Sequence, residues 1–323
     1  MAMKQHYLDG FTWAVDIDLS KYFDTLNHEV LMNIIRRDVY DKTLLVTIKA
    51  FLKSGVMEEG VIHETEAGSP QGGNLSPLLA NIYLNEFDRL LEERGHRFCR
   101  YADDIMILVR SERAAERVMS SSRDYLENVL KLKVNQEKST VGPLPGLKFL
   151  GFTMLDFTPR NKGRIVKITI HSKSLGRFKD KVRSILRERS NWTIEQTLSY
   201  FTIYVRGWLG YYALSEVIST MHKLSKWARR KLRARLWSQW KTSRNRYRKL
   251  KAVASDNMHG SVGMCLVYAR AHGPWHMSKY GIVQAILTND YLESLGLPDI
   301  LKMYEDSHVR LMNRRVREAR TVV

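Results

Sequence analysis

Residues 98–109 read Phe-Cys-Arg-Tyr-Ala-Asp-Asp-Ile-Met-Ile-Leu-Val, two largely apolar runs that flank a turn with two adjacent carboxylates, Asp103 and Asp104. The runs predict a strand hairpin over residues 97–110. Adjacent carboxylates repel each other and lose hydration when partly buried, so a bound cation is the economical explanation for the pair. Mg²⁺ suits this role because it takes carboxylate oxygens, waters and substrate phosphates. Acidic pairs are also common in hairpin turns, so these residues alone leave a purely structural interpretation open.

A second strand is expected to bring a third carboxylate to this pair. Residues 13–19 alternate apolar and acidic side chains, which is typical of a strand whose end meets an ion site. Both Asp16 and Asp18 are candidates for the third ligand. Three carboxylates around two metal ions would suit an in-line phosphoryl displacement, because the ions stabilise the attacking and the leaving oxygen.

Residues 68–84 supply a third motif, Gly-Ser-Pro-Gln-Gly-Gly-Asn-Leu-Ser-Pro-Leu-Leu-Ala-Asn-Ile-Tyr-Leu. Glycine and proline mark a loop, Ser76 and Pro77 suit the start of a helix, and the apolar residues after them follow helical spacing. Glycines let a backbone approach a ligand closely, and the Gln71 amide both donates and accepts hydrogen bonds. The motif therefore predicts a ligand-facing loop ahead of a packed helix that ends near residue 93.

In this order the three motifs resemble the palm of reverse transcriptases, and residues 68–84 closely resemble the matching run of group II intron reverse transcriptases. The resemblance selects Asp18 over Asp16, because the aromatic Phe23 stands five residues after Asp18. It implies two Mg²⁺ ions held by the catalytic residues Asp18, Asp103 and Asp104, with the Leu19 carbonyl as a further ligand. It also implies that Phe23 lies under the incoming sugar and rejects a 2′-hydroxyl. The residues implied to contact the incoming nucleotide and its template partner are Pro70, Gln71 and Gly72.

Two later segments extend the resemblance. Residues 132–139 resemble the next palm motif, which implies that Lys138 approaches the phosphates of the nucleotide. Residues 149–152 resemble the short strand beside the primer end. Each also has an ordinary interpretation: Lys138 as a solvated lysine, Phe23 as a core aromatic, and residues 149–152 as sheet packing.

The second half of the chain carries the positive charge. The sequence has a formal net charge of +18, and residues 1–150 contain 19 basic and 22 acidic residues, so residues 151–323 carry +21. Residues 223–251 contain thirteen basic residues and no acidic one, and a run of one sign implies a polyanionic partner. The aromatic and leucine residues of this run have the spacing of an apolar helix face. We expect them to pack rather than to stack on bases: Trp237, Trp240, Tyr247, Leu224, Leu232 and Leu236.

Three segments of this basic half, residues 204–212, 228–233 and 237–241, resemble the maturase region, or domain X, of group II intron proteins. In that family the region corresponds to a helical polymerase thumb that grips intron RNA and the template–primer duplex. We therefore expect nucleic-acid contacts from Arg206, Lys226, Arg229, Arg230, Lys231, Arg233, Arg235 and Lys241.

The expected fold class is α+β: a reverse transcriptase palm, with an antiparallel sheet and packed helices, followed by an α-helical thumb/maturase domain. We assign residues 1–158 to the palm with the remaining part of the fingers, 159–174 to a junction, 175–254 to the thumb and 255–323 to a helical C-terminal extension. Further strands are expected near residues 12–18, 131–135, 147–154 and 164–170, helices near 28–38, 42–54 and 112–130, and a loop at 255–263.

Composition excludes several other classes of protein. Two cysteines cannot form a zinc cluster of paired cysteines, and nothing indicates an oxidising compartment. The sequence shows no apolar run long enough to span a bilayer and no signal peptide, so we expect no membrane partner and a location in the bacterial cytoplasm. Compared with the family, the chain begins almost at the Asp18 strand. We therefore expect it to lack the fingers region before that strand, and the endonuclease that some relatives append.

The resulting hypothesis is an RNA-directed DNA polymerase of a group II intron with maturase activity. Its partners would be the intron RNA, an RNA template with a DNA primer, and deoxynucleoside triphosphates. The alternative is a truncated remnant that does not polymerise and acts only as an intron RNA-binding splicing factor. The sequence does not indicate an oligomeric state.

Overall fold

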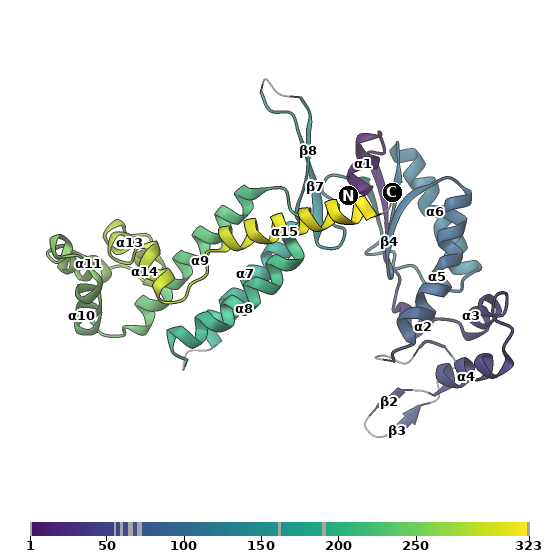
Figure 1. Ribbon diagram of the computed structural model, residues 1–323, viewed down its shortest axis with the longest axis horizontal. Coiled ribbons are helices and arrows are strands. Elements are labelled where there is room, and N and C mark those ends of the chain that lie inside the picture. Colours follow the sequence, from purple (N-terminus) through teal and green to yellow (C-terminus); the bar gives the residue numbers. More distant parts are fainter. Residues whose placement is uncertain are drawn as a thin grey trace. The chain divides into compact units, whose positions relative to one another are not determined.

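The computed structural model describes residues 2–54, 56–58, 61–63, 67–69, 73–160, 163–188 and 192–321 (Figure 1). The chain divides into two compact units, Met1–Val166 and Lys167–Val323. The boundary falls within a strand and inside the junction expected at residues 159–174. In the part of the chain that the structure describes, no helix is both long and apolar enough to cross a membrane.

An antiparallel sheet of four strands forms the centre of the first unit. Its strands are β1 (Trp13–Ile17), β4 (Arg97–Tyr101), β5 (Asp104–Val109) and β6 (Thr140–Pro143), in the order β4-β5-β1-β6. The register pairs Trp13 with Val109 and Ile17 with Ile105, so the start of β5 meets the end of β1. The confirmed fold class is therefore α+β, with the Asp103–Asp104 turn at the edge of the sheet where β1 ends.

The two faces of this sheet are covered differently. Side chains alternate along a strand, so Val15 and Ile17 of β1 point to one face and Ala14 points to the other. The first face packs on α5 (Ser76–Glu93) and α6 (Glu112–Asn128), which lie along it in Figure 1, and α3 (His28–Ile35) and α4 (Lys42–Lys53) continue that core. Asp16 and Asp18 share the phase of Ala14, so they face away from these helices.

The face opposite the helices holds a smaller apolar cluster. Tyr7 of α1 (Ala2–Leu8), Met154 of β7 (Phe152–Phe157) and Val166 of β8 (Ile165–Ile170) are buried there with Ala14. The strands β7 and β8 form a two-stranded sheet of their own, as do β2 (Val56–Glu58) and β3 (Val61–His63).

A polar contact fastens α1 to the β7–β8 pair. The Tyr7 hydroxyl donates a hydrogen bond to Asp156 at 2.5 Å, and Arg164 forms an ion pair with the same carboxylate at 2.6 Å. Arg164 also donates to the Tyr7 oxygen at 2.8 Å. This contact therefore joins α1 to β7 and to the residue directly before β8, which are distant from it in sequence.

Helices make up most of the second unit. In chain order they are α7 (Ser172–Glu188), α8 (Ile194–Tyr212), α9 (Ile218–Gln239), α10 (Ser243–Val253), the short 3₁₀ helix η1 (Asp256–Met258), α11 (Ser261–Ala269), α12 (Pro274–Met277), α13 (Gly281–Ile286), α14 (Asn289–Ser294) and α15 (Ile300–Thr321). The central helix is α9, which packs against α7, α12, α14 and α15. A reciprocal capping box between Thr193 and Gln196 starts α8.

Several boundaries expected from the sequence are wrong. Residues 131–135 form no strand. These residues lie in a loop that follows Lys131, whose φ is +53°. The loop buries the side chains of Leu132 and Val134, which produces the apolar alternation seen in the sequence. Val134 makes only an isolated bridge, to Leu19. The strand pairing with that side of β1 is β6, which sequence reasoning missed.

Three other elements are shorter than expected. The strand expected at 147–154 begins only at residue 152, because Leu150 and Gly151 both have positive φ. The helix expected at 28–38 ends at Ile35. The loop expected at 255–263 contains η1 and the start of α11.

Candidate active site

The sheet brings Asp18, Asp103 and Asp104 together. The register pairs Ile17 with Ile105, and continuing it by one residue places Asp18 opposite Asp104. Asp103 lies in the two-residue turn between β4 and β5, directly after Ala102, whose φ is +54°. A short turn with a positive φ holds the two neighbouring carboxylates at the sheet edge, beside the end of β1.

The charges of these carboxylates interact. Burial raises the pKa of Asp16 to about 6, and the nearby charges of Asp104 and Asp18 add to the effect. The pKa of Asp104 is also raised, by partial burial and then by Asp103 and Asp18, although its side chain is exposed. Lys148 opposes both shifts. The site therefore holds four carboxylates, with Asp16 among them, and more negative charge than its lysines offset.

Residues 132–139 wrap the end of β1. The amide of Asn135 donates to the Asp18 carbonyl at 2.9 Å, and the amide of Asp18 donates to the Ser139 hydroxyl at 3.1 Å. The Lys138 ammonium nitrogen lies 3.6 Å from an Asp18 carboxylate oxygen, on a side chain that is 67% exposed. Lys138 thus lies beside Asp18, and its expected approach to the phosphates of a nucleotide stays a prediction. Lys148 was not predicted from the sequence. The only signal for it was its position directly before residues 149–152.

The segment after Asp18 places Phe23 next to the loop of the third motif. Phe23 is the second residue of the helical turn α2 (Tyr22–Thr25), and its side chain is half-buried against the core. Its backbone carbonyl accepts a hydrogen bond of 2.7 Å from the Ser69 amide. Gly68 has φ +92°, and a Cβ there would lie 2.8 Å from the Asp24 carbonyl oxygen. Only glycine fits this approach, which brings the loop to α2. Pro70, Gln71 and Gly72 lie outside the described residues.

The donor chemistry of the site fits Mg²⁺, because several carboxylate oxygens gather where negative charge is in excess. The backbone carbonyl of Leu19, whose side chain is buried, follows directly. Among the residues that the structure describes, however, no three Asp, Glu, His or Cys side chains lie in an arrangement that would hold a metal ion. One Asp18 oxygen faces Lys138 instead. The described residues of the site therefore offer the oxygen donors that Mg²⁺ prefers, but their side chains are not arranged as a complete set of metal ligands.

Two family models match the chain in the order of its two units. Residues 3–154 match the model described as reverse transcriptase (RNA-dependent DNA polymerase), and residues 175–253 match that of the group II intron maturase-specific domain. The chain therefore joins a reverse transcriptase region to a group II intron maturase-specific region.

Two curated proteins and a solved structure are similar to this chain over different lengths. Protein YkfC of Escherichia coli is 32% identical over 178 residues, which cover 44% of this chain and 47% of YkfC. The group II intron-encoded protein LtrA of Lactococcus lactis is 41% identical over 91 residues, 28% of this chain and 15% of LtrA. The chain thus matches less than half the length of either relative. A structure of Candida albicans telomerase with a fragment of telomeric RNA aligns at 13% identity and a TM-score of 0.48, over 91% of this chain and 52% of that one.

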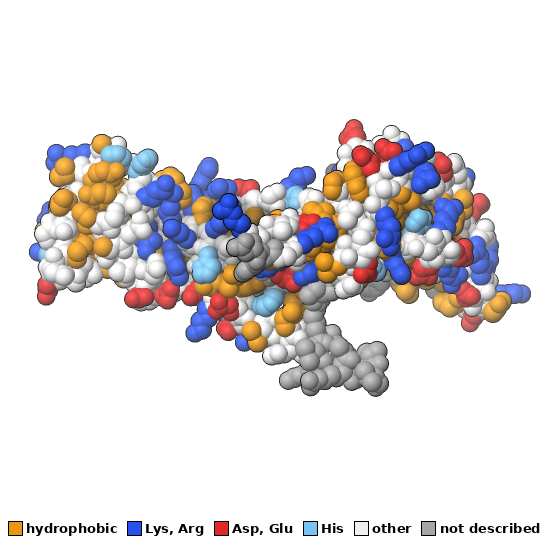
Figure 2. All heavy atoms as spheres, turned by 90° about the horizontal axis from the view of Figure 1, so that it is seen from above, with side chains coloured by type: hydrophobic (Ala, Val, Ile, Leu, Met, Phe, Trp, Pro, Cys, Tyr) orange, Lys and Arg blue, Asp and Glu red, His pale blue; other side chains and the backbone are white. Residues whose placement is uncertain are grey.

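The expected nucleic-acid contacts of the maturase domain separate into different environments. Arg206, Lys226 and Lys241 are exposed. Arg229 pairs with Glu293 at 3.5 Å, and Arg235 is half-buried. Figure 2 shows Lys and Arg side chains gathered on the visible face of the left-hand, helical part of the molecule. Arg230 and Lys231 lie against Trp275.

The expectation for Arg233 is wrong. Its side chain is 7% exposed, donates to the Leu287 carbonyl at 2.8 Å and donates to the Asn289 side chain at 3.0 Å. Burial lowers its pKa, and the charge of Arg229 adds to this effect. Arg233 therefore fastens α9 to Leu287 and to the first residue of α14, because its guanidinium satisfies a buried backbone carbonyl.

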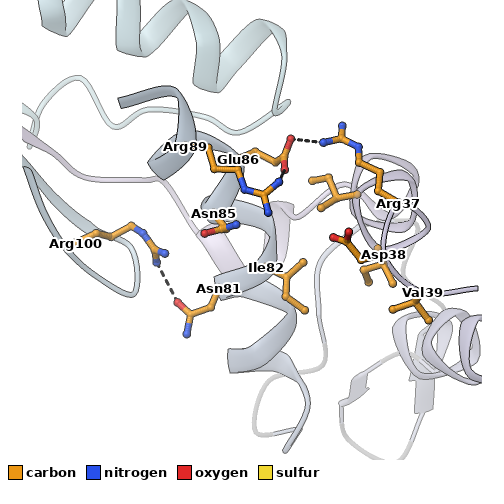
Figure 3. Close-up of a pocket in the computed structure, with 11 residues that line it drawn as sticks. Arg37, Asp38, Val39, Asn81, Ile82, Asn85, Glu86, Arg89 and Arg100 are labelled. Atoms are coloured by element: carbon orange, nitrogen blue, oxygen red, sulfur yellow. Dashed lines mark hydrogen bonds and ion pairs between the residues drawn. The ribbon is translucent and has the colours of Figure 1, made fainter. Parts of the chain in front are cut away.

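A cavity of about 380 Å³ lies elsewhere in the reverse transcriptase unit, between α3 and α5 (Figure 3). Arg37 and Arg89 approach Glu86 over it, at 2.6 and 3.7 Å. None of the expected site residues lines this cavity. It lies with the helices, and the carboxylates face the other way.

Asp16→Asn is expected to stabilise the protein in EDTA at pH 7.5. The folded-state pKa of about 6 exceeds the ordinary value of 3.8, so the folded state holds this proton more tightly than the unfolded state does. The free energy of unfolding of the wild type therefore falls as the pH rises from about 4 to about 6. Above about pH 6 the whole loss remains, on the order of 2–3 kcal/mol. Urea unfolding at pH 4.5 and 7.5 checks this. The increase in the free energy of unfolding caused by Asp16→Asn must be larger at pH 7.5 than at pH 4.5. An equal increase at both pH values would contradict the raised pKa of Asp16.

Proposed function

We propose that this chain is an RNA-directed DNA polymerase that also acts as the maturase of a group II intron. The observation that carries the proposal is the placement of Asp18 opposite Asp104, beside Asp103, at the sheet edge that the reverse transcriptase match covers. A cluster of carboxylates in which two members, Asp16 and Asp104, have raised pKa values is typical of a site that handles cations and phosphates. The substrates are a deoxynucleoside triphosphate and a DNA primer on an RNA template.

In the proposed reaction, the primer 3′-hydroxyl attacks the α-phosphate of the nucleotide and pyrophosphate leaves. Asp18, Asp103, Asp104 and the Leu19 carbonyl would hold two Mg²⁺ ions, which would supply positive charge to the reacting oxygens when bound. Lys138 offers a further cation to the phosphates. The main contribution of the protein is alignment and charge neutralisation, since phosphoryl transfer needs little else from it.

Selection of the nucleotide is proposed to depend on two neighbouring elements. Phe23 on α2 excludes a 2′-hydroxyl by its bulk. Pro70, Gln71 and Gly72 contact the new base pair, and the contacts of Gly68 and Ser69 with α2 support this role because they hold the start of that loop next to Phe23.

The helical unit is proposed to bind the intron RNA. The net charge of +21 over residues 151–323, most of which belong to this unit, and the match to the maturase-specific domain support this role. The exposed cations Arg206, Lys226 and Lys241 are proposed contacts, joined by Arg229, Arg230, Lys231 and Arg235. A cytoplasmic location belongs to the same proposal.

Primer extension on an RNA template tests the polymerase proposal. The intact chain should incorporate deoxynucleotides in the presence of Mg²⁺, and Asp103→Asn, which keeps the size of the side chain and removes its charge, should not. Equal incorporation by both proteins would refute the assigned site. No extension by the intact chain, together with splicing stimulated by Asp103→Asn at low Mg²⁺, would show the RNA-binding splicing factor instead.

A further inference from the structure

Two tryptophans of the helical unit hold four cations between three helices. On α9, Trp227 and Lys231 are four residues apart and therefore share a face. The Lys231 ammonium lies 4.2 Å from the ring centre of Trp275 on α12 and 5.9 Å from that of Trp227. We call the following residues the cation–tryptophan cluster: Lys179, Arg183, Trp227, Arg230, Lys231 and Trp275.

The other cations are fixed in the same way. The Arg230 guanidinium stacks 3.4 Å from the centre of Trp275 and donates to the Trp275 carbonyl at 3.1 Å and to the Ser278 hydroxyl at 3.3 Å. Arg183 and Lys179 of α7 lie 5.7 and 6.0 Å from the ring centre of Trp227. Each cation is thus positioned by a ring, and the cluster spans α7, α9 and α12.

The cluster keeps most of its charge. An aromatic face attracts a cation through its quadrupole and carries no net charge, so it positions the cation without neutralising it. Among the described residues, Asp180 pairs with Arg183, and no carboxylate lies within 4.0 Å of Lys179, Arg230 or Lys231. The pKa of Lys231 is lowered by burial and by the charges of Arg183 and Arg230. Arg229, one residue before Arg230, shows the contrast, because Glu293 pairs with it.

We propose that the cation–tryptophan cluster binds the phosphodiester backbone of a nucleic acid. Four like charges held close together, of which only Arg183 is paired with a described carboxylate, raise the energy of the free protein, and a row of phosphates relieves that repulsion by replacing small counterions. The cluster is also accessible, since Arg183 is 50% exposed and Trp275 is 38% exposed. The inference rests on the proposed RNA-binding role and specifies its site. It adds Lys179 and Arg183 of α7, and Trp275, which lies beyond the maturase-specific match, to the contacts.

The salt dependence of binding tests the charges of the cluster. A labelled oligouridylate of about 20 nucleotides is titrated with the full chain in EDTA, without nucleotide, over a range of KCl concentrations. The double variant Arg183→Gln/Lys231→Gln should reduce the slope of log affinity against log salt by about 1.4, since each phosphate contact on a single strand contributes about 0.7. The matched control is Lys302→Gln/Arg310→Gln on α15, where both side chains are exposed. Its slope should equal that of the wild type.

Replacement of a ring tests how the cations are held. Trp275→Leu removes a ring and no charge, so affinity should fall about twofold to fivefold at every salt concentration with the slope unchanged. Trp275→Phe should retain most of the affinity. Far-ultraviolet circular dichroism and thermal unfolding of each variant show whether the helices remain intact. If Trp275→Leu unfolds the unit, the Arg183/Lys231 pair still decides the proposal.

The outcomes separate this inference from the polymerase proposal. A slope for the Arg183/Lys231 variant equal to that of the α15 control would overturn the cluster, whatever the extension activity. A reduced slope in a chain that does not extend primers would support the cluster and refute only the polymerase. The same titration with an RNA duplex identifies the bound form, which is the one with the larger change in slope.

Discussion

Asp18→Asn is expected to lower primer extension by at least about 10²–10³-fold, the loss typical when one preorganised charge contact to the reacting groups is removed. Asp18 lies at the end of β1 opposite Asp104, and its carboxylate interacts with those of Asp16 and Asp104. Asparagine keeps the shape of the side chain and its backbone hydrogen bonds. The loss should therefore appear in kcat for nucleotide addition, with the thermal unfolding midpoint nearly unchanged.

Asp16→Asn is the matched control for this prediction. It makes the same chemical change two residues earlier, inside β1 and with its side chain in the same phase as that of Asp18, which directly follows the strand. Because Asp16 pairs with Met106 in mid-strand and is not at the sheet edge, its loss should reduce extension by less than about tenfold, the smaller effect of a charge beside the reacting groups. Single-turnover extension with both variants decides between the two aspartates. A larger loss for Asp16→Asn would exchange their roles and refute the assignment of Asp18.

Trp237→Ala is expected to destabilise the helical unit by about 3–5 kcal/mol, the range for removal of a large buried aromatic side chain. Trp237 is 1% exposed and belongs to the core that α9 shares with its neighbours. The cavity left behind would be lined by helices that cannot collapse without losing other contacts. Hydrogen exchange measured on peptides from residues 167–323 locates the effect in this unit, since the chain has two units and need not unfold in one step.

Tyr247→Ala is the control for the tryptophan. The sequence pattern assigned both residues to one apolar face, yet Tyr247 stands on α10 and is 40% exposed. Its truncation should cost less than about 1 kcal/mol, as for other surface substitutions. Comparable losses of protection for the two variants would contradict this description of the core.

Local sequence patterns predicted those helices and strands in which apolar residues repeat at a regular spacing and a turn residue or proline marks the start. The hairpin at residues 97–110 and the helix from Ser76 to Glu93 have the expected positions, because an apolar repeat meets a turn or a proline at each start. The alternation at 131–135 misled, since side chains of a loop are also buried when a sheet edge covers them. The strand β6 was missed because residues 140–143 include glycine and proline and owe their structure to pairing with β1.

The candidate site divides in the same way. Asp103 and Asp104 were candidates from the sequence because two adjacent acids in an apolar hairpin are readily explained by a bound cation. The resemblance to reverse transcriptases, through the aromatic Phe23 five residues later, selected Asp18 over Asp16. The approach of Lys148 to Asp16 and Asp104, and the interaction of Asp16 with Asp104, join residues that are 44 to 132 positions apart in the sequence. No local pattern encodes such a distance.

Among the cations of the helical unit, the sequence established only how many there are and that they share one sign. Whether a given arginine meets solvent, a carboxylate or a buried carbonyl depends on which helix packs against it. Arg230 stacks on Trp275, Arg233 is buried against the segment before α14, and Arg229 pairs with Glu293. These partners lie more than forty residues further along the chain. Their positions follow from the way the apolar faces of the helices are buried together, and that packing is decided only when the whole unit folds.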